Sequence, residues 1–304
     1  MSSAGGWRQT MRVRPPDPRR RPLCVSIGAS VLTARAPGKV NLSLLVGAPR
    51  ADGLHPLVSV VQAVSLADEL VLTPAAGDTD EVVCPGVGGP NLAGRALELF
   101  RAATGWDAPP QRLHISKRVP VAAGMGGGSA DAAAALRLAA RAAGGAPDEL
   151  LHELAVQLGA DVPSQLAPGR VLMTGAGERV DRLPDPEPFG LVIALSPHRL
   201  STPAVYAAFD RLGGARAPEE LERARASALA GEAPHAVNDL QDAARELCPE
   251  IDEALFPGAM VSGSGPTVFA TYPTPAAARI AAREIPRAIA VEPITAAFGE
   301  ARER

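Results

Sequence analysis

The chain is 304 residues long, is 46% hydrophobic and 21% charged, and carries a formal net charge of −3. This near-neutral composition indicates a globular protein of one or two domains and argues against a nucleic-acid-binding protein, which normally has a basic domain. Since no apolar run approaches the ~20 residues of a membrane span, we also expect no membrane partner.

The N-terminal segment differs from the rest of the chain. Residues 1–22 hold six arginines and four prolines but a single acidic residue, Asp17. Such a segment cannot bury enough apolar surface to become ordered, so residues 1–24 are predicted to be a disordered or non-native extension. A transit peptide is the alternative, because such peptides are rich in arginine and poor in acids, although this segment lacks an amphipathic pattern.

Alternating apolar and β-branched residues predict a strand-rich first half. We expect strands over 31–36, 40–47, 56–66 and 68–73, with a turn at 50–53. Helical spacing of apolar residues and runs of strong helix formers then predict further elements. These are helices over 91–103, 130–143 and 147–158, with a strand over 113–119 between the first two.

The second half mixes strands and helices. The predicted strands cover 171–175, 178–183 and 191–195, and a glycine-rich turn followed by a strand covers 261–271. The predicted helices cover 202–210, 218–230, 238–255 (interrupted near Cys248 and Pro249) and 275–284. This order predicts an α+β protein with an N-terminal domain over 25–185 and a C-terminal domain over 186–304.

The three cysteines, Cys24, Cys84 and Cys248, are scattered and lack the spacing of a metal site. We expect them to be reduced, buried thiols in a cytoplasmic protein. The sequence leaves the oligomeric state open between a monomer and a homodimer.

Residues 120–136 (PVAAGMGGGSADAAAAL) form the most informative segment, with four glycines within positions 124–128. Glycine lets backbone N–H groups approach an anion, and a helix N-terminus favours phosphate, so this segment predicts a phosphate-binding loop. We expect Gly127 to lie where phosphate approaches, and Ser129 to cap the helix or bind a metal ion. The alternative is a flexible linker, but linkers are flanked by polar residues rather than by a strand and a helix.

Two charged residues stand beside predicted turns. Lys39 follows the turn at Pro37 and Gly38, and Asn41 lies two positions on, on the same face of the strand. A lone lysine is usually solvated, but apolar strand residues flank this one. Asp161 follows a helix end at Gly159, where it is either a turn residue or a general base that accepts a proton from a substrate hydroxyl.

A second glycine-rich turn comes late in the chain, at residues 262–267 (SGSGPT). Its two glycines allow a tight turn whose backbone can approach a substrate or the phosphate loop. The alternative is an ordinary β-turn without a functional role.

Together these segments resemble, in order, the three motifs of the GHMP small-molecule kinases. The matching residues are Pro37, Gly38, Lys39, Asn41 and Leu42 in the first motif; Pro120, Gly124, Gly126, Ser129 and Ala130 in the second, where Met125 replaces the usual leucine; and Ser262, Gly263, Ser264, Gly265, Pro266 and Thr267 in the third.

The resemblance implies a two-domain α+β fold, with an N-terminal domain like the second domain of ribosomal protein S5 and a C-terminal α/β plait. It also implies an ATP-dependent kinase that uses Mg²⁺, with Lys39 and Asp161 as the catalytic pair. The implied ATP contacts are Pro120, Gly124, Met125, Gly126, Gly127, Gly128, Ser129 (also the metal contact) and Ala130, with Asn91 and Lys117 on the adenosine side.

The turn Arg50-Ala-Asp-Gly-Leu-His55 resembles one branch of this family, whose small-molecule substrate is cytidine diphosphate methylerythritol. Members of that branch phosphorylate its 2-hydroxyl in the non-mevalonate route to isoprenoids. In them a histidine reads the cytosine edge and two aromatic residues sandwich the ring; here Leu54 replaces the first aromatic residue. The implied substrate contacts are Asn41, His55, Thr202, Tyr206, Gly263, Ser264 and Gly265.

Two other functions are compatible with these motifs. One is a different GHMP kinase, of the homoserine or mevalonate-pathway type, against which the turn at 52–55 argues. The other is a non-catalytic nucleotide-binding relative, against which the presence of both Lys39 and Asp161 argues.

Overall fold

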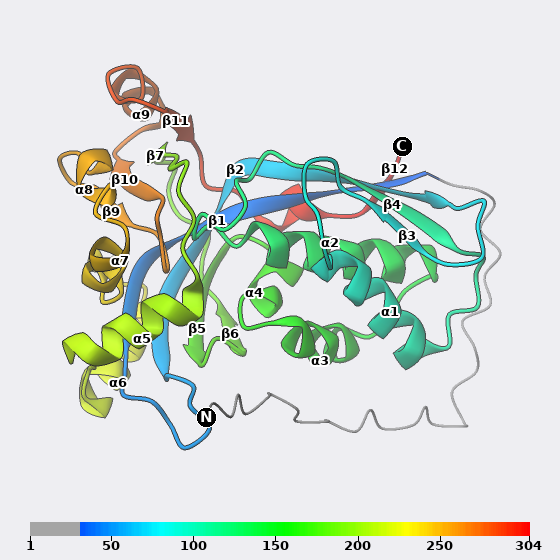
Figure 1. Cartoon of the computed structure of the whole chain (residues 1–304), viewed down its shortest axis with the longest axis horizontal. Helices are drawn as coiled ribbons and strands as arrows, with labels where there is room; N and C mark the ends of the chain where they lie inside the picture. Colours follow the sequence, from blue (N-terminus) through cyan, green and yellow to red (C-terminus); the bar gives the residue numbers. More distant parts are fainter. Residues whose placement is uncertain (1–30) are drawn as a thin grey trace, which may run out of the picture.

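The computed structural model describes residues 31–304, in which helices cover one face of a large sheet and a smaller sheet with its own helices lies beside it (Figure 1). The predicted N-terminal extension and Cys24 lie outside the described residues. The content of strands and helices confirms the predicted α+β class.

Two long antiparallel strands, β1 (Leu32–Val46) and β2 (Leu57–Pro74), form the centre of the large sheet. The prediction of four short strands over this region was therefore wrong. The chain at Pro37 and Gly38 does not turn, because the strand absorbs these residues at a register shift between Pro37 and Lys39. As a result Lys39 lies inside β1 rather than at its start.

Within residues 31–304 the large sheet has eight strands. Its main path runs β12-β1-β2-β4-β3, and β5 and β8 pair with β2 and β1 beside that path. The remaining bounds are β3 (Glu81–Val83), β4 (Gln111–Ser116), β5 (Arg170–Gly175), β6 (Arg179–Arg182), β8 (Val237–Asn238) and β12 (Arg302–Glu303).

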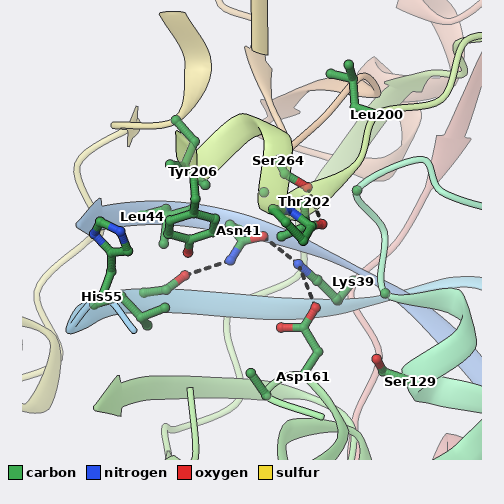
Figure 2. A pocket seen from close by; sticks show the side chains of 18 of the residues that line it. Lys39, Asn41, Leu44, His55, Ser129, Asp161, Leu200, Thr202, Tyr206 and Ser264 are labelled. Atoms are coloured by element: carbon green, nitrogen blue, oxygen red, sulfur yellow. Dashed lines mark hydrogen bonds and ion pairs between the residues drawn. The ribbon is translucent and has the colours of Figure 1, made fainter. Parts of the chain in front are cut away.

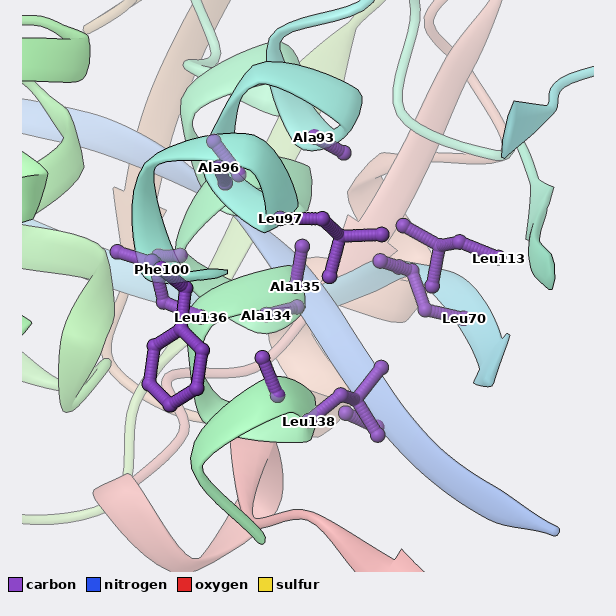
Figure 3. Packing of buried hydrophobic residues seen from close by; sticks show 14 of the residues in the cluster. Leu70, Ala93, Ala96, Leu97, Phe100, Leu113, Ala134, Ala135, Leu136 and Leu138 are labelled. Atoms are coloured by element: carbon purple, nitrogen blue, oxygen red, sulfur yellow. The ribbon is translucent and has the colours of Figure 1, made fainter. Parts of the chain in front are cut away.

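The helices of the first half cover this sheet: α1 (Leu92–Thr104), α2 (Gly127–Ala142), α3 (Asp148–Leu158) and α4 (Val162–Leu166). Figure 3 shows α2 packed between α1 and the sheet, with alanines facing leucines and Phe100. Small side chains on α2 let both neighbours approach its backbone closely, which explains why the alanine-rich run is fully buried. This packing fixes the position of the N-terminus of α2.

In the described part of the chain, the second sheet has four antiparallel strands in the order β11-β7-β10-β9, and the chain changes sheet between β6 and β7. Its strands are β7 (Gly190–Ala194), β9 (Met260–Val261), β10 (Val268–Tyr272) and β11 (Ala288–Val291). Strands β8 and β12 come after residue 185 in the chain, but both pair with β1 in the large sheet. The predicted domain boundary at residue 185 therefore stays a prediction. The helices here are α5 (Thr202–Leu212), α6 (Pro218–Leu229), α7 (Gln241–Leu247), α8 (Ile251–Ala254), α9 (Pro275–Ala281) and the 3₁₀ helix η1 (Ala296–Gly299).

Two smaller expectations can be compared with the structure. Cys248 is buried as predicted, whereas Cys84 is only half-buried, because it lies in a loop after β3 rather than in the core. None of the helices within residues 31–304 combines the length and the apolar character that crossing a membrane requires.

Candidate active site

A cavity of about 760 Å³ lies between the glycine loop, the centre of β1 and β2, and helix α5. This volume is in the range of small-molecule sites. The structure brings most of the predicted site residues together in its lining. They are Lys39, Asn41, His55, Pro120, Gly124, Gly126, Gly127, Gly128, Ser129, Asp161, Thr202, Tyr206, Gly263 and Ser264.

Lys39 is placed by the irregularity in β1. Because the register shifts there, its backbone N–H leaves the β-ladder and donates to the carbonyl of Met125 in the glycine loop, at 2.9 Å. Its side chain is 5% exposed, and Figure 2 shows the ammonium between Asn41 and Asp161. Nζ lies 2.7 Å from Asn41 Oδ1 and 3.5 Å from Asp161 Oδ2. A buried cation therefore faces the cavity with one carboxylate beside it.

Asn41 is held in one orientation by a chain of hydrogen bonds across β1 and β2. Its amide nitrogen donates to Ser59 Oγ at 2.8 Å, and Ser59 Oγ donates to the carbonyl of Ser43 at 2.6 Å. Since the amide nitrogen is used in this way, Oδ1 is the atom that turns toward Lys39. Ser59 thus orients the lysine through Asn41, a role that the sequence analysis missed.

Asp161 lies at the N-terminus of α4, a short helix that the sequence did not predict. Its backbone carbonyl accepts a hydrogen bond from Ser164 Oγ at 2.7 Å, which fixes the backbone of the turn. The side chain is 36% exposed and opens into the cavity. A carboxylate at this place can accept a proton from a hydroxyl group in the cavity.

The glycine loop lies between Lys39 and the turn at 262–265. Helix α2 begins at Gly127, three residues before the predicted start, and its N-cap is Gly126 in the left-handed conformation. The prediction that Ser129 caps the helix was therefore wrong; Ser129 lies in the first turn and lines the cavity. Free N–H groups of that turn are available to an anion.

The reason expected for Gly127 also needs correction. Gly127 is helical, and a Cβ atom there would lie 3.0 Å from Val119, away from the cavity. Gly128 also lines the cavity, and a Cβ atom there would meet no other atom within 4 Å, so the space beside it is open. At Gly126 a Cβ atom would lie 3.1 Å from Lys39 Cε, so a side chain at this position would press against the lysine.

We therefore expect Gly128→Val to raise the KM for ATP about tenfold or more, because the branched side chain would occupy space that phosphate needs. Steady-state kinetics at saturating second substrate measures this effect. Gly77→Val is the matched control, since Gly77 is exposed and also has open space at its Cβ position. An unchanged KM in a folded Gly128→Val protein would remove the loop from phosphate binding.

The turn at 262–265 forms the upper wall of the cavity near Lys39. A Cβ atom at Gly263 would lie 3.2 Å from Lys39 Nζ, so this glycine permits the close approach. Thr202 Oγ1 and Ser264 Oγ share a hydrogen bond of 2.9 Å, which joins α5 to the turn. Asn238, which sequence reasoning missed, donates to the carbonyls of Val261 and Gly263 at 2.8 Å each.

His55 and Tyr206 lie at the opposite end of the cavity from Ser129 (Figure 2). Their ring centroids are 5.0 Å apart, and the rings are tilted by 41°. Leu54, which replaces the expected aromatic residue, is 46% exposed and also lines the cavity. Burial, with a smaller effect of the Asp161 charge, raises the pKa of Tyr206 to about 12, so its hydroxyl stays protonated at neutral pH.

Five predicted contacts do not line the cavity. Met125, Ala130 and Gly265 are buried and do not line the cavity. Asn91 caps α1, where its Oδ1 accepts from the N–H of Ala93 at 2.9 Å. Contacts of Asn91 and Lys117 with adenosine stay predictions.

Lys117 belongs to a buried charge cluster beneath α2 that the sequence analysis missed. Its ammonium bonds both Asp68 on β2 and Asp131 on α2, the latter at 2.8 Å. Asp68 also accepts from the backbone N–H groups of Arg118 and Val119. Burial raises the pKa of Asp131 to about 7, and its Oδ1 has no partner among the described residues. The cluster ties the entry of the glycine loop to the sheet and to α2.

Lys117→Met should lower the free energy of unfolding by about 3 kcal/mol, because it leaves two carboxylates buried without a cation. The value is at the low end for a broken buried ion pair, since Lys117 keeps 14% exposure. Urea unfolding measures the loss. Arg118→Met is the control: its ion pair with Glu69 is largely exposed, so we expect at most about 1 kcal/mol. Equal losses in both variants would contradict the structural role of the cluster.

Two family models match the chain. The model of the GHMP kinases N terminal domain matches residues 91–169, and that of the GHMP kinases C terminal domain matches residues 217–291. The first match contains the glycine loop and Asp161, and the second contains the turn at 262–265. The predicted resemblance to this family is therefore confirmed.

Relatives and solved structures give a narrower comparison. A protein of Streptomyces coelicolor named 4-diphosphocytidyl-2-C-methyl-D-erythritol kinase is 46% identical, covering 78% of this chain and 86% of the relative. A protein of the same name from Thermobifida fusca is 42% identical, with 78% and 85% covered. A crystal structure of 4-(cytidine 5′-diphospho)-2C-methyl-D-erythritol kinase matches with a TM-score of 0.69 at 36% identity, over 86% of this chain and 98% of that one. A homoserine kinase from Cytophaga hutchinsonii, with a TM-score of 0.61 at 16% identity over 92% of this chain and 98% of its own, shares the fold.

Proposed function

The chain belongs to the 4-diphosphocytidyl-2-C-methyl-D-erythritol kinase branch of the GHMP kinases, and we propose that its cavity is the site at which that reaction occurs. The reaction transfers the γ-phosphoryl group of ATP to the 2-hydroxyl of 4-(cytidine 5′-diphospho)-2-C-methyl-D-erythritol. GHMP kinases are small-molecule phosphotransferases that use ATP as the phosphate donor. The homoserine and mevalonate kinases match this chain at 16% and 11% identity, which shows a common fold and no more, so those alternatives are not favoured.

The main observation in support of this assignment is the Lys39–Asp161 pair beside the N-terminus of α2. An anionic phosphate group at that N-terminus would lie next to the Lys39 ammonium, which stabilises the charge that develops during transfer. Asp161 would accept the proton of the 2-hydroxyl or orient that hydroxyl for attack. Asn41 holds the lysine, and the turn at 262–265 closes the wall above it.

The substrate extends from this pair toward His55. Its nucleotide end would lie between Tyr206 and Leu54, and its methylerythritol end near Thr202 and Ser264. Tyr206 supplies an aromatic face for the base, and Leu54 supplies apolar contact without a ring.

ATP would occupy the end of the cavity formed by the glycine loop and Ser129. The Ser129 hydroxyl faces the cavity in the first turn of α2, and a hydroxyl together with phosphate oxygens suits Mg²⁺. When bound there, the metal ion would neutralise phosphate charge. A cytoplasmic location and a monomeric or dimeric state stay predictions from the sequence.

The test is a substrate panel with purified protein and ATP. We expect ADP release with the cytidine diphosphate substrate, and no release above background with homoserine or mevalonate. A product phosphorylated at the 2-hydroxyl, identified by ³¹P nuclear magnetic resonance, supports the assignment. Turnover of homoserine or mevalonate but not of the cytidine compound would contradict it.

A further inference from the structure

Asp210 is a charged residue of the cavity that the phosphoryl transfer does not use. Of the described residues that line the cavity, Lys39, Asp161 and Asp210 carry a formal charge, and the first two are paired with each other. Asp210 lies four residues after Tyr206 on α5, so both side chains lie on the same face of that helix. It is therefore at the proposed nucleotide end, far along the cavity from the transfer end.

The contacts of His55 show what this end can recognise. His55 Nδ1 lies 2.8 Å from the carbonyl oxygen of Gly47. A carbonyl only accepts, so Nδ1 carries a hydrogen and is already used inside the protein. Nε2 lies 3.4 Å from Asp210 Oδ1, so one oxygen of the carboxylate faces the imidazole. This distance is longer than that of an ordinary hydrogen bond.

This end of the cavity, beside His55 and Asp210, favours a ligand that brings a hydrogen-bond donor. The Asp210 side chain is 45% exposed, so its carboxylate has lone pairs open to the cavity, while His55 is almost fully buried. Cytosine carries an exocyclic amino group with two hydrogens, and uracil carries a carbonyl oxygen at the same position. A carboxylate accepts from the amino group of cytosine but repels the carbonyl of uracil.

We propose that Asp210 accepts a hydrogen bond from the exocyclic amino group of the substrate's base and so makes the enzyme select cytidine over uridine. This inference rests on the proposed function, because it needs the nucleotide end of the substrate to lie beside α5. It goes beyond that function by assigning base selection to a carboxylate on α5. The stacking residues Tyr206 and Leu54 cannot make this distinction, since every base has an aromatic face.

The experiment compares the cytidine diphosphate substrate with its uridine diphosphate counterpart at saturating ATP, in the wild-type protein and in Asp210→Asn. A good carboxylate–amino pair gives about 1–3 kcal/mol of discrimination, so wild-type kcat/KM should favour cytidine by roughly 5–150-fold. Asparagine presents both a donor and an acceptor and can serve either base. We expect the ratio to fall at least fivefold, through a higher KM for the cytidine substrate with kcat retained.

Leu54→Tyr is the control, because added stacking should change the KM of both substrates by the same factor. A ratio in Asp210→Asn within twofold of the wild-type ratio would overturn the inference while leaving the kinase assignment intact. Absence of wild-type turnover with the cytidine substrate would instead overturn the proposed function.

A second measurement uses only the wild-type protein, in case the variant fails to fold. A substrate with an N4,N4-dimethylated cytosine has no hydrogen on the exocyclic nitrogen, so we expect its kcat/KM to fall toward that of the uridine compound. A dimethylated substrate as good as the cytidine substrate would also overturn the inference.

Discussion

Asp161→Asn is expected to lower kcat by about 10²–10⁴-fold while the KM for ATP changes little. The size is that of a lost general base, because an amide cannot take the proton of the substrate hydroxyl. Nucleotide binding should persist, since Asp161 lies on α4 and the phosphate cradle is the loop before α2. The near-isosteric change also keeps the backbone of the turn, which Ser164 holds through the carbonyl of Asp161.

Kinetics at saturating concentrations of both substrates, together with calorimetric titration of a non-hydrolysable ATP analogue, separates the two effects. Asp148→Asn is the matched control, because Asp148 is exposed on the helix that precedes the turn, and its kcat should equal that of the wild type. A kcat for Asp161→Asn above about half the wild-type value would remove Asp161 from the mechanism.

The sequence predicted the parts of this site that local chemistry determines. The glycine loop could be recognised because phosphate binding needs glycine and a helix start within a few neighbouring residues. The helix itself was predicted too late: low helix propensity excluded Gly127 and Gly128, but tertiary packing of α2 against α1 and the sheet outweighs that propensity.

Other features depend on residues far apart in the chain and could not be predicted from local patterns. The buried cluster joins Asp68, Lys117 and Asp131, whose neighbours in sequence give no sign of the pairing. Strands β8 and β12 form by pairing with β1. Each has only two residues, which is too short for a periodic pattern in the sequence. Likewise the register shift at Lys39 has no local signal beyond a Pro-Gly pair, which ordinarily indicates a turn.

That register shift places Lys39 beside Asp161, and the second large effect is the loss of activity expected when Lys39 is replaced. Lys39→Ala should lower kcat by about 10³-fold or more, because it removes the buried positive charge beside Asp161 and the proposed phosphate position. Removal of one cation at a transferring phosphoryl group has effects of this order in other phosphotransferases. The backbone N–H bond to Met125 does not involve the side chain, so the loop should keep its place.

Lys39→Arg should fail to restore activity, because the site around the ammonium has no room for a wider group. Cβ positions at Gly126 and Gly263 lie only 3.1 Å from Cε and 3.2 Å from Nζ, so glycine backbone lies close to the lysine on two sides. A planar guanidinium would have to displace the loop or the turn, and it could not keep the 2.7 Å bond to Asn41 in the same geometry. We expect kcat within about tenfold of the alanine variant, measured at saturating substrates.

Arg35→Met, an exposed position on the same strand, is the control and should retain wild-type kcat. If Lys39→Arg instead keeps a kcat within about threefold of wild type, a positive charge of any shape is sufficient there, and the tight fit around Lys39 has no part in catalysis.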